Sequence, residues 1–292
     1  MDYTIQNKQI TLTVSSRGAE PQRIQSIDGT DYLWTGSQDY WPGRGPHLFP
    51  FIGRLFESRY EYKGVSYPLS IHGFLRESEL SVKEQGEDYI SFELSSNEET
   101  LKQYPFEFVV YIHYKLVDSA VHISFEVVNK DDKTMLFAFG GHPGFNVPLD
   151  KGLSFEDYRL EFDRPATPKR AKTTQSVLIS GEFVDYPLKD GNIIELRHDL
   201  FDDDAIILKD MAKSVTLKSE KGSRALRVDY PDFEYIGFWH TVKKDAPFIC
   251  IEPWTGLPGC DGEVQDLEKH GDMIALEPAS TYINEWVITI IV

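Results

Sequence analysis

The segment FEFVVYIHYKL, Phe106–Leu116, carries the clearest structural signal in the sequence. Every second residue in it is apolar or aromatic, and this alternation is typical of a β-strand with one buried face. After a turn at Asp118 and Ser119, the segment VHISFEV, Val121–Val127, repeats the alternation. Two such segments joined by a short polar turn predict a long β-hairpin.

The same alternation recurs in shorter segments on both sides of this hairpin. They are Ile10–Val14, Ile90–Leu94, Leu160–Phe162, Ala205–Leu208, Val215–Leu217, Leu226–Tyr230, Ile236–His240 and Trp286–Val292. Helical periodicity is nearly absent, and one short helix is expected over Asn97–Gln103, with Asn97 as its N-cap and Pro105 beyond its end. The pattern predicts an all-β fold, a large antiparallel β-sandwich that forms a single domain over residues 1–292. Arg164–Ser176 is expected to be a long surface loop.

The composition restricts the kinds of partner. With 41% hydrophobic residues the chain can bury a large core, and its formal charge of −17 argues against nucleic acid or an anionic membrane as a partner. No apolar run has the length of a membrane span, and the first residues lack the pattern of a signal peptide. The two cysteines, Cys250 and Cys260, have no metal-type spacing to a histidine. We therefore expect a cytoplasmic protein with a small polar ligand.

A glycine- and proline-rich segment surrounds one histidine. In FGGHPGFNVP, Phe139–Pro148, His142 lies among three glycines and two prolines. Such a loop lets a ligand approach the main chain while it holds an imidazole nearby. Ligand contact and a structural hydrogen bond are both compatible with this context, and we select His142 as a candidate acid or base.

A second segment presents a carboxylate in a similar way. We expect a second loop over FICIEPWTGLPG, Phe248–Gly259, in which Glu252 ends an apolar run next to a proline and an aromatic residue. His142 and Glu252 together form a plausible acid/base pair. Trp254 is the best candidate among Trp34, Trp41, Trp239 and Trp254 for stacking on a ligand ring, although each of them could belong to the core.

Three further polar residues adjoin apolar segments. Arg54 lies within FPFIGRL, Phe49–Leu55, and an arginine so placed needs either a structural ion pair or a polar ligand. His72 precedes a glycine in SIHGFLR, Ser70–Arg76. Asp204 is the last carboxylate before the apolar run Ala205–Leu208, so it could enter a pocket, although a solvated acidic run or a calcium site is also possible.

The remaining histidines fall into three groups. His113 and His122 are expected on a strand face, His198 and His270 are expected in solvent, and His47 and His240 are possible pocket residues. A zinc site competes with the acid/base interpretation, but neither an HExxH nor a CxxC spacing is present. The sequence also lacks a glycine-rich phosphate loop before a helix and a G-x-S-x-G elbow, so those two classes of protein are not expected. No ligand spacing indicates a metal site, and none is expected.

The chain resembles the aldose 1-epimerase (galactose mutarotase) family, with the closest likeness to its LacX-like branch. The resemblance rests on the order and the sequence contexts of Arg54, His72, His142, Asp204 and Glu252. The resemblance extends from Gly53 to the segment Asn284–Trp286. It implies a galactose mutarotase-like supersandwich without a cofactor, whose small-molecule sugar substrate changes between its α and β anomers. It also implies that Glu252 is the general base, that His142 is the general acid, that His72 and Arg54 bind the sugar, and that Asp204 accepts from its hydroxyls.

Two features depart from the galactose-specific branch of the family. That branch usually has an asparagine a few residues before its Gly-Arg pair, where this chain has Phe49–Ile52, and it lacks the Pro-Gly that follows His142. A hexose-6-phosphate mutarotase, for which Arg17, Arg23, Arg44 and Arg76 supply candidate phosphate ligands, and a non-catalytic sugar-binding protein are the alternatives. For an enzyme, the negative charge of the whole chain is expected to favour the protonated form of His142.

Overall fold

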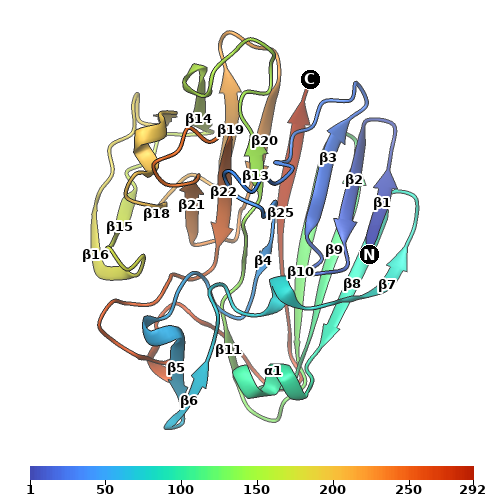
Figure 1. Ribbon diagram of the computed structural model, residues 1–292. Coiled ribbons are helices and arrows are strands. Elements are labelled where there is room, and N and C mark those ends of the chain that lie inside the picture. Colours follow the sequence, from blue (N-terminus) through green and yellow to red (C-terminus); the bar gives the residue numbers. More distant parts are fainter.

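The computed structural model describes residues 1–292, which form an almost entirely antiparallel β-structure with two large sheets (Figure 1). The nine-stranded sheet has the order β17 (Ile193–Glu195), β14 (Tyr158–Phe162), β19 (Ser214–Ser219), β20 (Ala225–Asp229), β25 (Thr281–Ile291), β10 (Ala120–Asn129), β9 (Phe108–Val117), β8 (Tyr89–Ser95) and β7 (Ser81–Gln85). The eight-stranded sheet has the order β16 (Ile179–Asp185), β15 (Lys169–Thr173), β18 (Ile206–Lys209), β21 (Tyr235–Trp239), β22 (Phe248–Trp254), β12 (Gly140–Gly141) and β4 (His47–Leu48), and β13 (Gly144–Asn146) also pairs with β22.

Three small sheets complete the fold. They are β1 (Asp2–Gln6), β2 (Ile10–Ser15) and β3 (Pro21–Ser26); β11 (Met135–Phe137) and β24 (Ile274–Leu276); and β23 (Gln265–Asp266), β5 (Arg59–Tyr62) and β6 (Val65–Pro68). Short 3-10 turns lie at Phe56–Ser58, Leu75–Glu77, Phe155–Asp157, His198–Phe201 and Leu267–Lys269. The only α-helix, α1 (Glu98–Gln103), is too short to cross a membrane, and no other helix could do so. The expected all-β class and supersandwich architecture are confirmed.

The predicted hairpin is confirmed as β9 and β10, which pair over their full length with Phe125 opposite Ile112. Buried and partly exposed residues alternate along both strands, as the period of two requires. The predicted helix is also confirmed. The Asn97 side chain accepts hydrogen bonds from the backbone N–H groups of Glu99 and Thr100, which would otherwise lack partners at the helix start.

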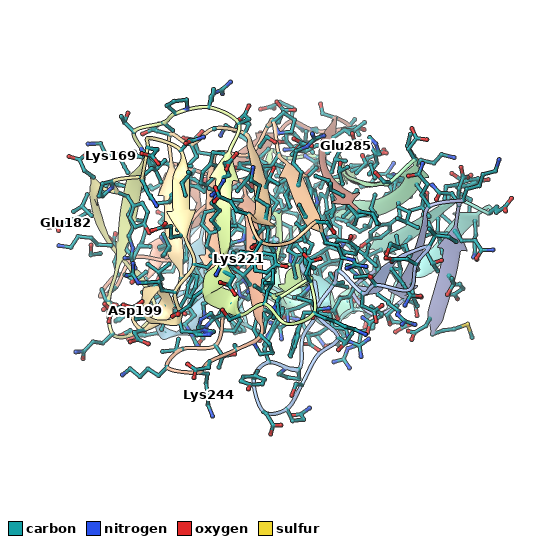
Figure 2. The ribbon with its side chains drawn as sticks, turned by 90° about the horizontal axis from the view of Figure 1, so that it is seen from above. Lys169, Glu182, Asp199, Lys221, Lys244 and Glu285 are labelled. Atoms are coloured by element: carbon teal, nitrogen blue, oxygen red, sulfur yellow. The ribbon has the colours of Figure 1, made fainter.

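Apolar side chains of both large sheets meet in one cluster of 63 buried residues. Phe125 of β10 stacks on Phe139, with ring centroids 4.3 Å apart, and in this way joins the nine-stranded sheet to the segment that leads to His142. Charged side chains lie on the outside. Figure 2 shows Lys169 and Glu182 at the outer edge that β15 and β16 form.

Two sequence expectations need correction. Arg164–Ser176 is not one long loop, because β15 runs through it and pairs with β16 and β18. Only Ala171 of this strand is buried, so the strand lacks the apolar alternation from which the other strands were predicted. Glu252 lies within β22 rather than in a loop. All seven residues of β22 are buried, and a strand buried on both faces shows no alternation.

Candidate active site

A cavity of about 1010 Å³ opens over the eight-stranded sheet. Its lining includes all six residues selected from the sequence: Arg54, His72, His142, Asp204, Glu252 and Trp254. They come from β22, from the turn before β18 and from the segments that follow β4, β6 and β12. The fold therefore assembles residues that are far apart in the chain into one polar site.

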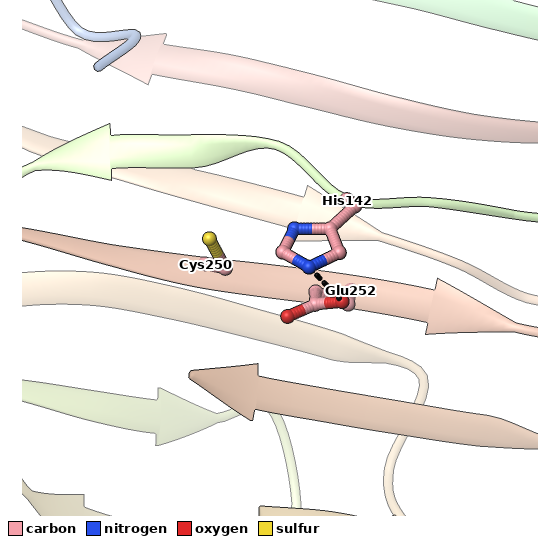
Figure 3. A group of neighbouring side chains, drawn as sticks. All are labelled: His142, Cys250 and Glu252. Atoms are coloured by element: carbon pink, nitrogen blue, oxygen red, sulfur yellow. Dashed lines mark ion pairs between the residues drawn. The ribbon is translucent and has the colours of Figure 1, made fainter. Parts of the chain in front are cut away.

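Pairing with β22 places His142 next to Glu252. Gly140 of β12 pairs with Trp254, and Gly144 of β13 pairs with Cys250, so the residues between them cross over Glu252. The backbone N–H of His142 also donates to the Pro46 carbonyl at 3.0 Å. As a result, Nε2 of His142 lies 3.2 Å from Oε2 of Glu252 (Figure 3).

Gly140 is required by close packing at this point. A Cβ atom on it would lie 2.6 Å from both the Pro253 carbonyl oxygen and Cδ1 of Trp254. A side chain at this position would push β12 away from β22 and would separate His142 from Glu252.

The acid/base pair is buried and lacks other hydrogen-bond partners. The Glu252 side chain is 1% exposed and that of His142 is 12% exposed. Neither oxygen of Glu252 nor Nδ1 of His142 has a hydrogen-bond partner in the protein. A buried carboxyl group without donors is costly, so this pair is arranged for a ligand rather than for stability.

Burial shifts both groups toward their neutral forms. The pKa of Glu252 is raised well above its ordinary value, first by burial and then by the negative charge of Asp204. Burial lowers the pKa of His142 to about 3. Local desolvation therefore outweighs the negative charge of the whole chain, and the expectation that this charge keeps His142 protonated is wrong.

Two reciprocal hydrogen bonds hold the segments of Arg54 and His72 together. The His72 N–H donates to the Gly53 carbonyl at 2.8 Å, and the Gly53 N–H donates to Nδ1 of His72 at 3.0 Å. Since burial keeps the pKa of His72 well below its usual value, the ring is neutral and carries its proton on Nε2. His72 can therefore donate to a ligand oxygen, and Arg54 follows Gly53 directly.

Asp204 closes the short turn before β18. Its backbone N–H donates to the Phe201 carbonyl at 3.0 Å, and its φ of 75° lies in the left-handed region. Aspartate tolerates this region better than most residues do. Burial raises the pKa of Asp204, whereas the Trp239 indole and the positive charge of Arg54 act in the opposite direction.

The aromatic side chains differ from the expectation. Trp254 is 3% exposed and packs in a buried cluster, so its ring is not free to stack on a ligand. Its Nε1 has no hydrogen-bond partner in the protein. Trp41 and Trp239, which also line the cavity, are less buried. Their ring centroids lie 5.0 and 5.7 Å from that of His142 and 5.7 Å from each other. No local sequence signal distinguishes these tryptophans, because their exposure depends on the packing of distant strands.

None of the six other histidines lines the cavity. His47 and His240 are buried core residues; His47 bonds the Tyr114 hydroxyl at 2.6 Å, and His240 lies 3.1 Å from His198. His198 stacks on Phe155 and is half-buried, so it is not simply solvated. The His270 side chain is 7% exposed and pairs with Asp272 at 2.5 Å. The acidic residues near His198 and His270 in the sequence indicated exposure to solvent, but the fold gives both side chains partners.

Several cationic side chains line the cavity. Of the arginines considered for a phosphate, only Arg76 lines the cavity. Arg170, Lys172 and Lys243 were missed, and the first two belong to the segment that was expected to be a loop. Arg54 and Arg170 form no ion pair, whereas Lys172 pairs with Glu182 and Arg76 with Glu77.

The fold and the site define a class of large β-sandwich proteins in which a polar cavity holds an imidazole and a carboxyl group in contact. The family model described as aldose 1-epimerase matches residues 1–271, and the chain belongs to this family. The galactose mutarotase related enzyme from Lactobacillus acidophilus is 35% identical, with a TM-score of 0.95 over 99% of this chain and 97% of that one.

Two further relatives cover the whole chain or nearly all of it. A galactose mutarotase-like protein from Lactobacillus casei is 32% identical, with a TM-score of 0.94 over 99% of this chain and 100% of that one. The plasmid-encoded protein LacX of Lactococcus lactis subsp. lactis is 32% identical over 299 residues, which is 100% of both chains. The resemblance to the family and to its LacX-like members is confirmed.

Proposed function

We propose that the protein is an aldose 1-epimerase (mutarotase), an isomerase that interconverts the α and β anomers of a free aldohexose. The observation that carries this proposal is the 3.2 Å contact between His142 and Glu252 at the floor of a cavity that also presents Arg54, His72 and Asp204. One imidazole and one carboxyl group can move the two protons that opening of a hemiacetal ring requires.

The reaction consists of two coupled proton transfers. Glu252 takes the proton of the anomeric hydroxyl while His142 gives a proton to the ring oxygen, and the ring opens to the aldehyde. Rotation about the C1–C2 bond exposes the other face of the carbonyl. His142 then takes its proton back and Glu252 returns its own to O1, so the enzyme ends in its starting state. Each transfer typically contributes about two to four orders of magnitude in rate.

The protonation state of the pair must change when the sugar binds. Burial favours neutral His142 and protonated Glu252. The assigned roles need the proton on His142, and the 3.2 Å separation is short enough for this transfer. Sugar hydroxyls that donate to the unpartnered Glu252 oxygens favour the carboxylate, because hydrogen bonds to the charged form lower its pKa.

The surrounding side chains suit a polyhydroxylated ring. Arg54 and the Nε2–H of His72 donate to sugar oxygens, and Asp204 accepts from sugar hydroxyls. Trp41 and Trp239 contact each other beside His142 and offer apolar surfaces to the C–H faces of the ring. Trp254 contributes its unpartnered Nε1–H, in contrast to the stacking role considered for it.

Polarimetry tests the proposal directly. The optical rotation of freshly dissolved α-glucose and α-galactose is followed with and without the protein, and we expect the approach to equilibrium to be faster with it. The protein would instead be a non-catalytic sugar-binding protein if it accelerated anomer exchange for none of a panel of free and phosphorylated aldoses but bound a sugar saturably in calorimetry.

A second candidate substrate is a phosphorylated aldose. Arg54 and Arg170 line the cavity without ion pairs, and Arg76, Lys172 and Lys243 line it as well, although the chain carries a formal charge of −17. An arginine fork binds phosphate oxygens well. The same polarimetric assay with glucose 6-phosphate separates the candidates, because a higher kcat/KM than for glucose would favour the phosphorylated substrate.

A further inference from the structure

We propose that His142, Cys250 and Glu252 form a binding site for a thiophilic divalent cation, Zn²⁺ or its analogue Cd²⁺, and that an ion bound there inhibits the acid/base chemistry. The inhibitory effect rests on the proposed function, whereas the binding site does not depend on it.

The positions of the three side chains support this site. Cys250 and Glu252 are alternate residues of β22, so their side chains lie on the same face of the strand. His142 crosses over the same strand between β12 and β13. One ligand atom from each residue lies within 4.8 Å of those of the other two, and Figure 3 shows all three side chains together.

The separations are close to those of a metal centre. Ligand atoms of a tetrahedral zinc ion with bonds of about 2.0 to 2.3 Å are roughly 3.3 to 3.8 Å apart. From an upper limit of 4.8 Å, the side chains need to approach by about 1.5 Å at most, which rotations of Cys250 and Glu252 can supply.

The state of the ligand atoms also favours a cation. Both Glu252 oxygens and Nδ1 of His142 are buried without hydrogen-bond partners, and Cys250 is 0% exposed and not part of a disulfide. A set of one nitrogen, one sulfur and one oxygen suits Zn²⁺ or Cd²⁺, whereas Mg²⁺ and Ca²⁺ prefer oxygen ligands alone. The fourth coordination position would face the cavity and could take a water molecule.

Occupancy of this site would stop the proposed reaction. A cation that binds the Glu252 carboxylate and the His142 imidazole uses the lone pairs that must accept protons. Cys250 takes no part in the proton transfers, so its substitution separates metal binding from catalysis.

The test uses the full-length protein after treatment with a chelator. Zn²⁺ is titrated into the polarimetric assay, and Cd²⁺ binding is measured separately by equilibrium dialysis and by the ultraviolet thiolate-to-cadmium charge-transfer band. We expect Zn²⁺ to inhibit and EDTA to restore the activity, and we expect one Cd²⁺ to bind with a thiolate band. Cys250→Ser and Cys250→Ala are expected to keep the basal activity, to lack the band and to raise the inhibitory Zn²⁺ concentration at least about tenfold.

Cys260→Ala is the matched control, because Cys260 is the other free cysteine and lies outside the cluster. It is expected to keep both the inhibition and the band. Inhibition that is equal in the parent protein and both Cys250 variants, or a band that survives without Cys250, would overturn the proposal. If the protein is not a mutarotase, the band and the dialysis still decide whether the site exists, so the two proposals fail separately.

Discussion

The hydroxyl group of Thr255 forms hydrogen bonds with both the N–H and the carbonyl group of Phe139, an arrangement that we call the Thr255 clamp. Oγ1 of Thr255 accepts a hydrogen bond from the Phe139 N–H at 2.9 Å and donates to the Phe139 carbonyl at 3.1 Å. Phe139 precedes the β12 segment that leads to His142, and Thr255 follows β22, which carries Glu252. This contact therefore fixes the two chain segments whose relative position sets the distance within the acid/base pair.

Replacement of this hydroxyl group is expected to loosen the pair. Thr255→Val keeps the shape of the side chain but leaves the buried Phe139 N–H unpaired, which costs about 1 to 3 kcal/mol of unfolding free energy. We also expect kcat to fall about tenfold, because small errors in position strongly slow proton transfer. Thr255→Ser retains the hydroxyl and should remain close to the parent in both denaturant unfolding and polarimetry. Equal activity of the Val and Ser variants would show that the clamp does not position His142.

The acid/base pair is expected to act mainly on kcat. Glu252→Gln keeps the size of the side chain but cannot accept the proton, and His142→Asn removes the titrating ring. Each change should lower kcat by about two or more orders of magnitude and change KM much less. The double variant should be little worse than the poorer single variant, since both transfers belong to one cycle.

Stability provides an internal control for this pair. The Glu252 carboxyl group is buried without hydrogen-bond donors, so Glu252→Gln is expected not to lower the melting temperature. A variant that keeps the parent's stability and nearly its full kcat would remove Glu252 from the mechanism, and Asp204 would then be the next carboxylate to test.

The sugar-binding side chains should affect KM as well as kcat. Arg54→Ala removes an unpaired cation from the cavity, and His72→Asn removes the Nε2–H donor while asparagine still tolerates the observed φ of 65°. A charged hydrogen bond contributes about 1.5 to 3 kcal/mol, so we expect kcat/KM to fall about tenfold to a hundredfold. Arg164→Ala, an exposed arginine outside the cavity, is the control and should leave both constants unchanged.

Arg170 distinguishes the two candidate substrates. If the sugar carries a phosphate, Arg170→Ala should raise KM for the 6-phosphate about tenfold or more and leave the constants for the free sugar unchanged. The comparison is made by polarimetry on glucose and glucose 6-phosphate, with Arg164→Ala as the reference. Equal effects on both sugars would argue that Arg170 does not contact a phosphate group.

Buried histidines predict a loss of stability in acid. Burial lowers the pKa of His47 to about 4 and that of His240 to about 4, compared with about 6.5 in an unfolded chain. Between these values the unfolded chain binds more protons, so the free energy of unfolding is highest above pH 6.5 and falls as the pH decreases toward 4. His47 alone should contribute about 3 kcal/mol to this loss.

Thermal unfolding between pH 7 and pH 4 measures this effect. His47→Gln should reduce the dependence of the melting temperature on pH, whereas His122→Gln, at a partly exposed position of β10, should not. The prediction fails if both variants retain the slope of the parent protein.

Local patterns in the sequence determined much of the fold. The alternation over Phe106–Leu116 and Val121–Val127 specified the hairpin, because a period of two puts one side of each strand into the core. Asn97 marked the helix start, since its side chain caps the nearest free N–H groups. His142 and Glu252 stood out because of their neighbours in the chain, and those same neighbours carried the family resemblance.

The tertiary structure alone decided which residues meet and how their environment changes them. The short polar strand β15 brings Arg170 and Lys172 to the cavity. The packing of the strands buries Trp254, whereas Trp41 and Trp239 remain partly exposed beside His142. The register of β12 and β13 on β22 places His142 close to both Glu252 and Cys250. Such contacts depend on pairing between distant segments, and the pKa shift of His142 depends on burial from all sides, so neither can be read from neighbouring residues.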